Sequence, residues 1–347
     1  EQITLMVHEA ERLQRSLNLS EGPIMQVAYF DMGSKRLDRL LIIIHHLVFD
    51  GVSWNILLED IEIAIRQLQN GERIKLPSKT SSIKQWGERL IEHYKSDVLN
   101  KEQMFWTNKK WEKSTPLPVD YPDGKKENTV GTEETTIISI DAKKTNKLLE
   151  NCKLHNIKII EVLLANLAIT LSKWTRSSAV LINLMTHGRA QLFDELDLTR
   201  TIGDFAFSYP ILIENNNTKS LHDEIIVIRN IIASIPNSGL GYTLSRYCEP
   251  NSALATRLKS FPQPEVFFNY IGRYNFETAM FAKTFEPIYN AVSPDQYRIH
   301  LLDFNISIIE GKLQLEVIYS KMVHKKSTID YLAKEFVHSL LSYTGLA

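Results

Sequence analysis

Two hydrophobic periods alternate along this chain, and this alternation limits its fold more than any other feature. Stretches of period two, or of continuous apolar character, are typical of strands, and a period near 3.6 is typical of helices. The expected strands cover residues 24–31, 40–44, 134–140, 179–185, 205–214, 265–271, 301–309 and 313–319. The expected helices cover residues 5–17, 53–69, 82–94, 101–111, 143–154, 159–174, 220–235 and 327–341. Strands mixed with helices throughout predict an α/β protein built of two sandwich lobes.

The length of the chain agrees with a division into two lobes. Its 347 residues exceed what a single compact core usually holds. A segment rich in proline and charge at 116–132 interrupts the periodic patterns and is typical of a linker. We therefore expect an N-terminal lobe at 1–115 and a C-terminal lobe at 133–347.

Charge and hydropathy disfavour several classes of protein. The 40 lysines and arginines nearly balance the 41 acidic residues, which argues against a general nucleic-acid binder. The longest apolar stretch, 159–171, contains Glu161 and Asn166 and is too short to cross a bilayer, so it predicts a buried helix. Cys152 and Cys248 form no metal-binding cluster, and no secretion signal opens the sequence. These features predict a cytoplasmic protein without a membrane span.

The strongest candidate for chemistry lies between an expected buried strand and an expected helix. Here His45 and His46 are followed by Asp50 and Gly51, and Ser53 is the expected N-cap of the helix. If both histidines continued the strand, their side chains would point to opposite faces, so one could serve a site while the other packs inward. A carboxylate at Asp50 could hold the loop by accepting N–H groups, and Gly51 would permit a sharp reversal.

Three interpretations of this segment are open from residue types alone. A neutral imidazole is the usual protein base near pH 7, so one histidine could take up a proton. Adjacent histidines near an aspartate are, however, more often structural than catalytic. A zinc site is the third interpretation. It is disfavoured by the opposed faces of His45 and His46 and by the lack of HExxH or CxxC spacing.

Residues 45–60 read HHLVFDGVSWNILLED and resemble the HHxxxDGxSW signature of epimerization domains. These domains belong to the condensation-domain superfamily of nonribosomal peptide synthetases. Further segments resemble motifs of the same family in the same order: TSSIKQW at 80–86, HGR at 187–189 with DLTRTIG at 197–203 and SYP at 208–210, PNSGLGY at 236–242, and PEVFFNYIG at 264–272. By this resemblance the chain begins partway through the family's first lobe.

The resemblance implies a fold, a reaction and a set of partners. The fold would be two chloramphenicol-acetyltransferase-like α/β lobes that form a V with a central tunnel. The substrate would be an aminoacyl or peptidyl thioester on the 4′-phosphopantetheine of a carrier-protein domain. The domain would remove and return its α-proton, so that L and D forms equilibrate. The partners would be this carrier and neighbouring synthetase domains, with no cofactor or metal bound by the domain itself.

The resemblance also assigns roles to residues. His46 corresponds to the catalytic histidine, and Asp50 to a residue that mainly holds the loop. His45, Gly51 and Ser53 complete the supporting motif. Backbone amides at Gly51 to Ser53 could stabilise the enolate oxygen. The residues expected to line the tunnel are Met185, His187, Asp204, Ser208, Tyr209, Asn269 and Tyr270, and the side chain of Asn269 could stabilise the same oxygen.

The chain departs from the family at three positions. Met185 stands where the family has a glutamate that serves as a second acid–base group, and a thioether cannot exchange a proton usefully. Ala190 replaces the glutamate that ends the HGRE motif, and Asp204 replaces a tryptophan. Because aspartates are usually exposed, we interpret Asp204 as a surface or loop carboxylate, although it is the nearest acidic substitute in the sequence.

Two alternatives to an epimerase follow from these departures. Without its second acid–base group, the domain could be a catalytically silent module that docks carrier proteins or serves as structure. It could also be a condensation-type domain in which His46 positions an amine for amide formation. The Ser53–Trp54 pair and the PNSGLGY segment count against this last alternative, because the family pattern links them to epimerization.

Overall fold

The computed structural model describes residues 2–190, 192–214, 220–274, 278, 280–282, 284, 286 and 291–343. Two compact units are present, which we call the first unit and the second unit. The first unit is built from residues 1–87, 193–206 and 276–294, and the second from residues 88–192, 207–275 and 295–347. The chain therefore passes between the units several times.

The expected linker at 116–132 lies inside the second unit. Its backbone is bonded there: the N–H groups of Asp120 and Tyr121 donate to the carbonyl of Val323, both at 3.1 Å. Short 3-10 turns at Pro122–Glu127 and Val130–Thr132 contain one of its prolines and both of its glycines. The division of the chain thus differs from the predicted one, because proline and charge also occur in ordered turns.

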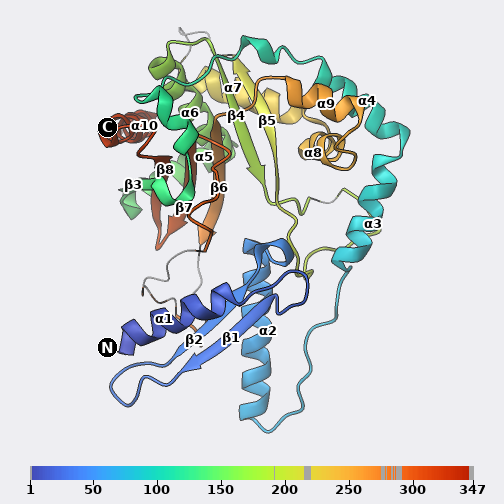
Figure 1. Cartoon of the computed structure of the whole chain (residues 1–347), viewed down its shortest axis with the longest axis vertical. Coiled ribbons are helices and arrows are strands. Elements are labelled where there is room, and N and C mark those ends of the chain that lie inside the picture. The colour runs from blue at the N-terminus through green and yellow to red at the C-terminus, as the bar shows by residue number, and fades with distance from the viewer. Residues whose placement is uncertain are drawn as a thin grey trace. The chain divides into compact units, whose positions relative to one another are not determined.

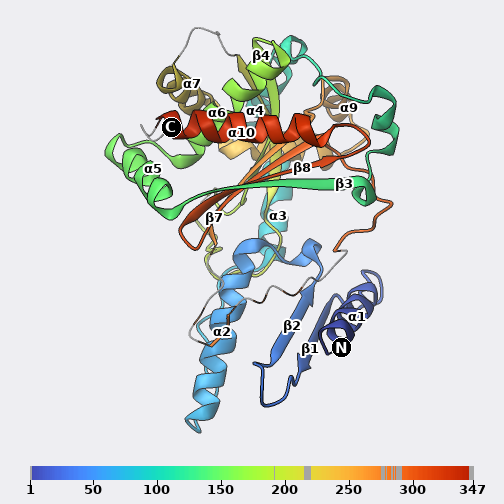
Figure 2. The ribbon, with the colours of Figure 1, turned by 90° about the vertical axis from the view of Figure 1, so that its left-hand side faces the viewer.

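The first unit holds a small antiparallel sheet. Strands β1 (Met25–Phe30) and β2 (Arg39–Ile44) pair with Met25 opposite Ile44, and helix α1 (Gln2–Arg15) packs on both of them (Figure 2). The prediction that the second strand is covered on both faces is wrong. Its residues are half-buried or exposed, and the helix that packs on the two-stranded sheet is α1.

Helix α2 (Gly51–Gln69) follows directly on the double-histidine segment. Its N-cap is Asp50, whose Oδ1 accepts the N–H of Ser53 at 2.8 Å, so the predicted cap at Ser53 is wrong by three residues. The helix ends at the C-cap Asn70, as predicted, and Gly71 follows with a φ of 71°. Helix α3 (Ile83–Tyr94) begins in this unit and continues into the second.

The second unit is built on a six-stranded mixed sheet of order β3-β8-β7-β6-β4-β5. Strand β6 runs parallel to β4 and β7, and the other neighbours are antiparallel. The strands are β3 (Glu133–Ile140), β4 (Ala179–Thr186), β5 (Phe207–Glu214), β6 (Val266–Tyr274), β7 (Leu302–Ile309) and β8 (Lys312–Ser320). The helices are α4 (Asp97–Thr107), α5 (Ala142–Leu154), α6 (Ile159–Thr175), α7 (Leu221–Ser234), α8 (Leu240–Tyr247), α9 (Ala253–Ser260) and α10 (Lys326–Tyr343).

The two faces of this sheet differ in character. Along β7, Leu302, Phe304 and Ile306 are fully buried, whereas the alternating Asp303 and Asn305 are half-buried. Helices α5, α6, α7 and α10 pack on the strands of the sheet, and Figure 1 shows them gathered on one side of it. One face is therefore the core of the unit, and the other carries polar side chains. The prediction of an α/β sandwich is confirmed for this unit.

Within the described chain, no single helix is both long and apolar enough to span a bilayer. Helices α5 and α6 together meet the length and composition, with a bend of 108° between them. The side chains of α6 are mostly buried in the core, as the sequence predicts for this apolar stretch.

Candidate active site

The two adjacent histidines have different environments. Strand β2 ends at Ile44, so the prediction that both side chains alternate across a strand is wrong. His45 caps a 3-10 turn (His46–Val48), and its Nδ1 accepts the N–H of Leu47 at 3.1 Å. The side chain of His46 is 73% exposed, so it is open to a reactant. His45 is therefore a structural residue, and His46 is the histidine available for chemistry.

Asp50 and Ser53 hold the segment that follows. Asp50 is 5% exposed, and its Oδ1 accepts both the N–H and the hydroxyl of Ser53, each at 2.8 Å. The fully buried Ser53 Oγ is also 3.2 Å from both the carbonyl oxygen and the backbone nitrogen of Gly203. The start of helix α2 is thus joined to a loop that lies 150 residues later in the chain.

Further bonds attach this loop to other segments of the first unit. Arg200 forms ion pairs with Glu59, at 2.6 Å, and with Asp60, which both lie on α2. The hydroxyl of Thr201 donates to the carbonyl of Ser81 at 2.5 Å. Three of the sequence motifs, at 45–60, 80–86 and 197–203, therefore meet in one place, which explains why they occur together.

An aromatic cluster supports the same loop. Trp86, from the TSSIKQW segment, lies with its ring centroid 5.3 Å from that of Phe193 and 5.9 Å from that of Phe205. All three are less than a tenth exposed. Gly203 passes so close that a Cβ atom there would lie 2.9 Å from Ile83 Cδ1. The loop is fixed by packing as well as by hydrogen bonds.

Asp204 is the next residue along this loop, and it faces His46. Its Oδ2 lies 3.4 Å from His46 Nδ1, and its side chain is 27% exposed. Its other carboxylate oxygen, Oδ1, accepts the N–H of Ala206 at 3.2 Å. The expectation of a loop carboxylate is met, but the sequence does not predict that this carboxylate lies beside the histidine.

In the second unit, the candidates Met185 and Ser208 pair across β4 and β5 and are both half-buried. Asn183, on the same face of β4, donates to Ser208 Oγ at 3.0 Å and lies 3.1 Å from His300 Nε2. His187 is exposed beyond the end of β4, and its Nδ1 accepts the N–H of Arg189 at 3.1 Å. A polar surface thus surrounds Met185 on this face of the sheet.

Two of the tyrosines expected in the tunnel belong to the core of the second unit. Tyr209 is 4% exposed, and burial raises the pKa of its hydroxyl to about 12. Tyr270 is opposite Ile306 in the sheet and packs against the hydrophobic core, where burial also raises its pKa. Asn269 is instead opposite Asn305, on the polar face. Strand alternation therefore separates the Asn269–Tyr270 pair.

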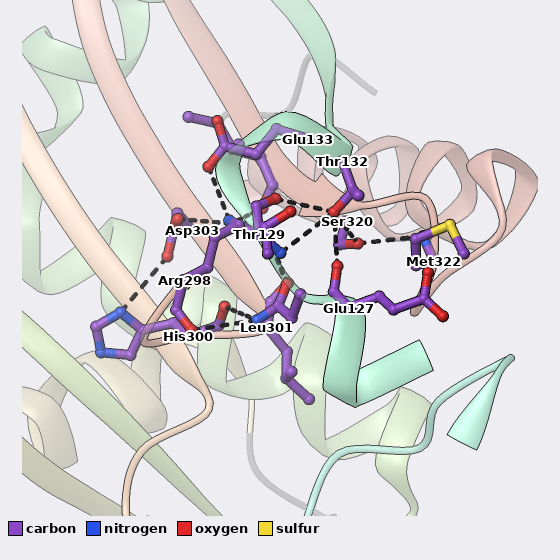
Figure 3. A network of polar contacts seen from close by, with 12 residues as sticks. Glu127, Thr129, Thr132, Glu133, Arg298, His300, Leu301, Asp303, Ser320 and Met322 are labelled. Atoms are coloured by element: carbon purple, nitrogen blue, oxygen red, sulfur yellow. Dashed lines mark hydrogen bonds and ion pairs between the residues drawn. The ribbon is translucent and has the colours of Figure 1, made fainter. Parts of the chain in front are cut away.

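A buried polar network that the sequence analysis did not identify lies at the start of β7 (Figure 3). Arg298 is ion-paired with Asp303 at 2.7 Å and with Glu133 at 2.8 Å, and His300 Nδ1 is 3.6 Å from Asp303 Oδ1. Burial lowers the pKa of His300 to about 4, so this imidazole is neutral near pH 7. Burial raises the pKa of Asp303. The sequence signal for this network is the polar Asp303 between the apolar Leu302 and Phe304, which indicates that one face of β7 is polar.

The described residues include no group of three or more histidine, cysteine, aspartate or glutamate side chains that could hold a metal ion.

Comparison with protein families identifies a match to the condensation domain over residues 1–345. Among curated proteins, tyrocidine synthase 2 from Brevibacillus parabrevis is 33% identical over 338 residues, which cover 96% of this chain. Gramicidin S synthase 1 from Brevibacillus brevis is 30% identical in an alignment 354 residues long that covers 97% of this chain. The chain spans only 9% and 31%, respectively, of the length of these two relatives.

Comparison with solved structures gives a similar result. The epimerization domain from the third module of tyrocidine synthetase B superposes with a TM-score of 0.88 at 30% identity, over 99% of this chain and 76% of that one. The X-domain from teicoplanin biosynthesis superposes with a TM-score of 0.70 at 17% identity, over 98% of this chain and 76% of that one. The second likeness bears on the fold alone.

Proposed function

Because this chain belongs to the condensation-domain family of nonribosomal peptide synthetases, we propose that it is an epimerization-type domain that exchanges the α-proton of an aminoacyl or peptidyl thioester. The thioester would be carried on the 4′-phosphopantetheine of a carrier protein. The proposal therefore requires two kinds of partner, this carrier protein and the neighbouring synthetase domains. The domain itself would need no bound cofactor.

One observation carries this proposal: an exposed imidazole on a rigid frame. His46 is 73% exposed, whereas Asp50 and Ser53 beside it are 5% and 0% exposed and are bonded to one another. A base must be both accessible and fixed in position. The likeness to the tyrocidine epimerization domain favours α-proton exchange over amide formation.

The chemistry proceeds through His46. Its neutral imidazole takes the α-proton, and the electron pair left on carbon passes to the thioester oxygen as an enolate. The first amides of α2, at Gly51 and Val52, lie at the positive end of a 19-residue helix and could stabilise a nearby anion. The amide of Ser53 serves less well, because it already donates to Asp50.

Met185 bears on the inversion step of this proposal. Inversion needs a proton returned to the opposite face of the α-carbon, and the glutamate expected for this role is absent. Each acid–base group contributes roughly 100- to 10,000-fold to a rate. We therefore expect exchange of the α-proton to be faster than inversion.

The test uses the full chain with a carrier-protein domain of its own synthetase, loaded with each of a panel of L-aminoacyl groups in deuterated water. Deuterium at the α-carbon that disappears in His46→Gln supports the proposal, and the fraction of D product measures inversion. Met185→Glu should raise this fraction at least tenfold. The matched control Met185→Gln should not raise it, because glutamine has the size of glutamate but no ionisable proton.

Met185 also supports a second candidate, a silent module that docks carrier proteins. Carrier binding without any deuterium uptake, in the parent chain and in Met185→Glu, would favour this candidate and exclude the epimerase. An amide product on addition of a second loaded carrier would instead identify a condensation-type domain.

A further inference from the structure

Asp204 and His46 form a pair that the epimerization-family pattern does not contain. The pattern has a tryptophan after the glycine that corresponds to Gly203, whereas this chain has an aspartate. Its carboxylate Oδ2 lies 3.4 Å from His46 Nδ1. The pair therefore joins the histidine assigned as base to a residue at which this chain departs from the family pattern.

The position of Asp204 is fixed from both sides. Gly203, just before it, is bonded through both backbone groups to the buried hydroxyl of Ser53. Ala206, just after it, donates its N–H to Asp204 Oδ1. Ser53 is in turn bonded to Asp50, four residues after His46. The backbone segments that carry the two residues are thus connected by hydrogen bonds within one compact unit.

The contact selects one form of the imidazole. A carboxylate beside Nδ1 favours the tautomer that carries its proton on Nδ1, and this leaves the lone pair on Nε2 to accept a proton. His45 has the opposite arrangement, because its Nδ1 accepts the N–H of Leu47 and must be unprotonated.

We propose that Asp204 is a positioning residue for His46: it holds the proton on Nδ1 and so makes Nε2 the base. This inference rests on the proposed function for its catalytic part, whereas the tautomer it assigns does not depend on any activity. It also gives a role to the aspartate that stands where the family pattern has tryptophan. Asp204 acts through the imidazole, since its Oδ2 faces Nδ1 and its Oδ1 is bonded to Ala206.

The expected effect is intermediate in size. In buried serine-protease triads, exchanging the aspartate for asparagine lowers the rate roughly 10,000-fold, because the wrong tautomer is favoured. The side chain of His46 is 73% exposed, so water screens the pair and competes for Nδ1. A loss of roughly 10- to 100-fold in the rate of α-proton exchange is therefore expected for Asp204→Asn.

The test is a nitrogen NMR spectrum of the full chain labelled in its ten histidines, at about pH 8.5, where ordinary imidazoles are neutral. His46→Gln identifies the signals of His46. In the parent chain Nδ1 should carry the proton. In Asp204→Asn the new amide N–H can donate to Nδ1, so the proton should move to Nε2, while the oxygen can still accept from Ala206. Asp204→Glu should restore the Nδ1 proton and at least part of the exchange rate.

The inference is overturned by an Nε2 proton on His46 in the parent chain, or by the same tautomer and exchange rate in Asp204→Asn as in the parent. Failure of the proposed function has a different signature, because a chain that never takes up deuterium can still show the tautomer change. Loss of exchange in Asp204→Asn without any tautomer change, when KM is unaltered, would also count against positioning through Nδ1.

Discussion

Replacing Ser53 by alanine removes a fully buried hydroxyl that bonds to Asp50 and to both backbone groups of Gly203. The bonds that this hydroxyl shares with the charged Asp50 and with the backbone of Gly203 are then lost at a buried position. A hydrogen bond to a charged group contributes roughly 1.5–3 kcal/mol, and one between neutral groups roughly 0.5–1.5 kcal/mol. We expect Ser53→Ala to lower the free energy of unfolding of the first unit by about 2–4 kcal/mol, a large part of a typical domain stability of roughly 5–15 kcal/mol.

Urea unfolding followed by tryptophan fluorescence measures this loss, since Trp54 and Trp86 report on the first unit. Hydrogen exchange with mass spectrometry locates it, because peptides that contain residues 197–206 should lose protection. Ser172→Ala is a matched control. Ser172 is 2% exposed, and among the described residues its hydroxyl has no hydrogen-bond partner, so its removal should not lower stability.

Equal stability losses in the two variants would refute this account. Unchanged protection of residues 197–206 in Ser53→Ala would do so as well, because the loop would then be held by packing alone. In either case the bonds between Ser53 and Gly203 would not determine where Asp204 lies.

Two other perturbations test the second unit. A Cβ added at Gly124 would lie 1.6 Å from the carbonyl oxygen of Met322, so Gly124→Ala should destabilise the protein by more than about 3 kcal/mol. The control is Gly87→Ala in helix α3, where nothing lies within 4 Å of the added Cβ, and it should stabilise the protein by up to about 1 kcal/mol. Equal shifts of the melting temperature in the two variants would contradict this account. The folded-state pKa of His300 is about 4 against an ordinary 6.5, so the unfolded chain binds the extra proton, and stability should be complete above pH 6.5 and fall as pH drops towards 4. The loss is at most about 3 kcal/mol, and His300→Gln should flatten this part of the pH dependence of urea midpoints; equal slopes in both proteins would count against it.

Periodicity was enough to predict the strands and most helices, because long elements carry many residues of the same pattern. It failed for two helices of eight residues each, α8 (Leu240–Tyr247) and α9 (Ala253–Ser260). Gly239, with a φ of 88°, ends a 3-10 turn directly before α8. Helices this short are stabilised by packing, here of Tyr242 and Leu244, and not by local preference.

The same contrast applies to the candidate site. The motif at 45–60 could be identified from the sequence, and so could the role of Asp50 as a loop holder. The environments of the two histidines could not, because the strand ends at Ile44, where its apolar run ends, and the chain then enters a 3-10 turn that the pattern does not reveal. The neighbour of His46 could not be predicted either, since it comes from residue 204 and depends on how a distant loop is bonded to Ser53.

Met185 and Asp204 affect different steps of the proposed reaction, so their variants should affect different quantities. Proton removal requires only that one imidazole have its lone pair on Nε2, and the contact of Asp204 with Nδ1 bears on this step. Inversion requires in addition a proton donor on the other side of the carbon, and Asp204 is a poor candidate because its Oδ2 already faces His46. Asp204→Asn should therefore lower deuterium uptake and D product together, whereas Met185→Glu should raise the ratio of D product to deuterium uptake. An opposite pattern would mean that Asp204 is itself the second acid–base group.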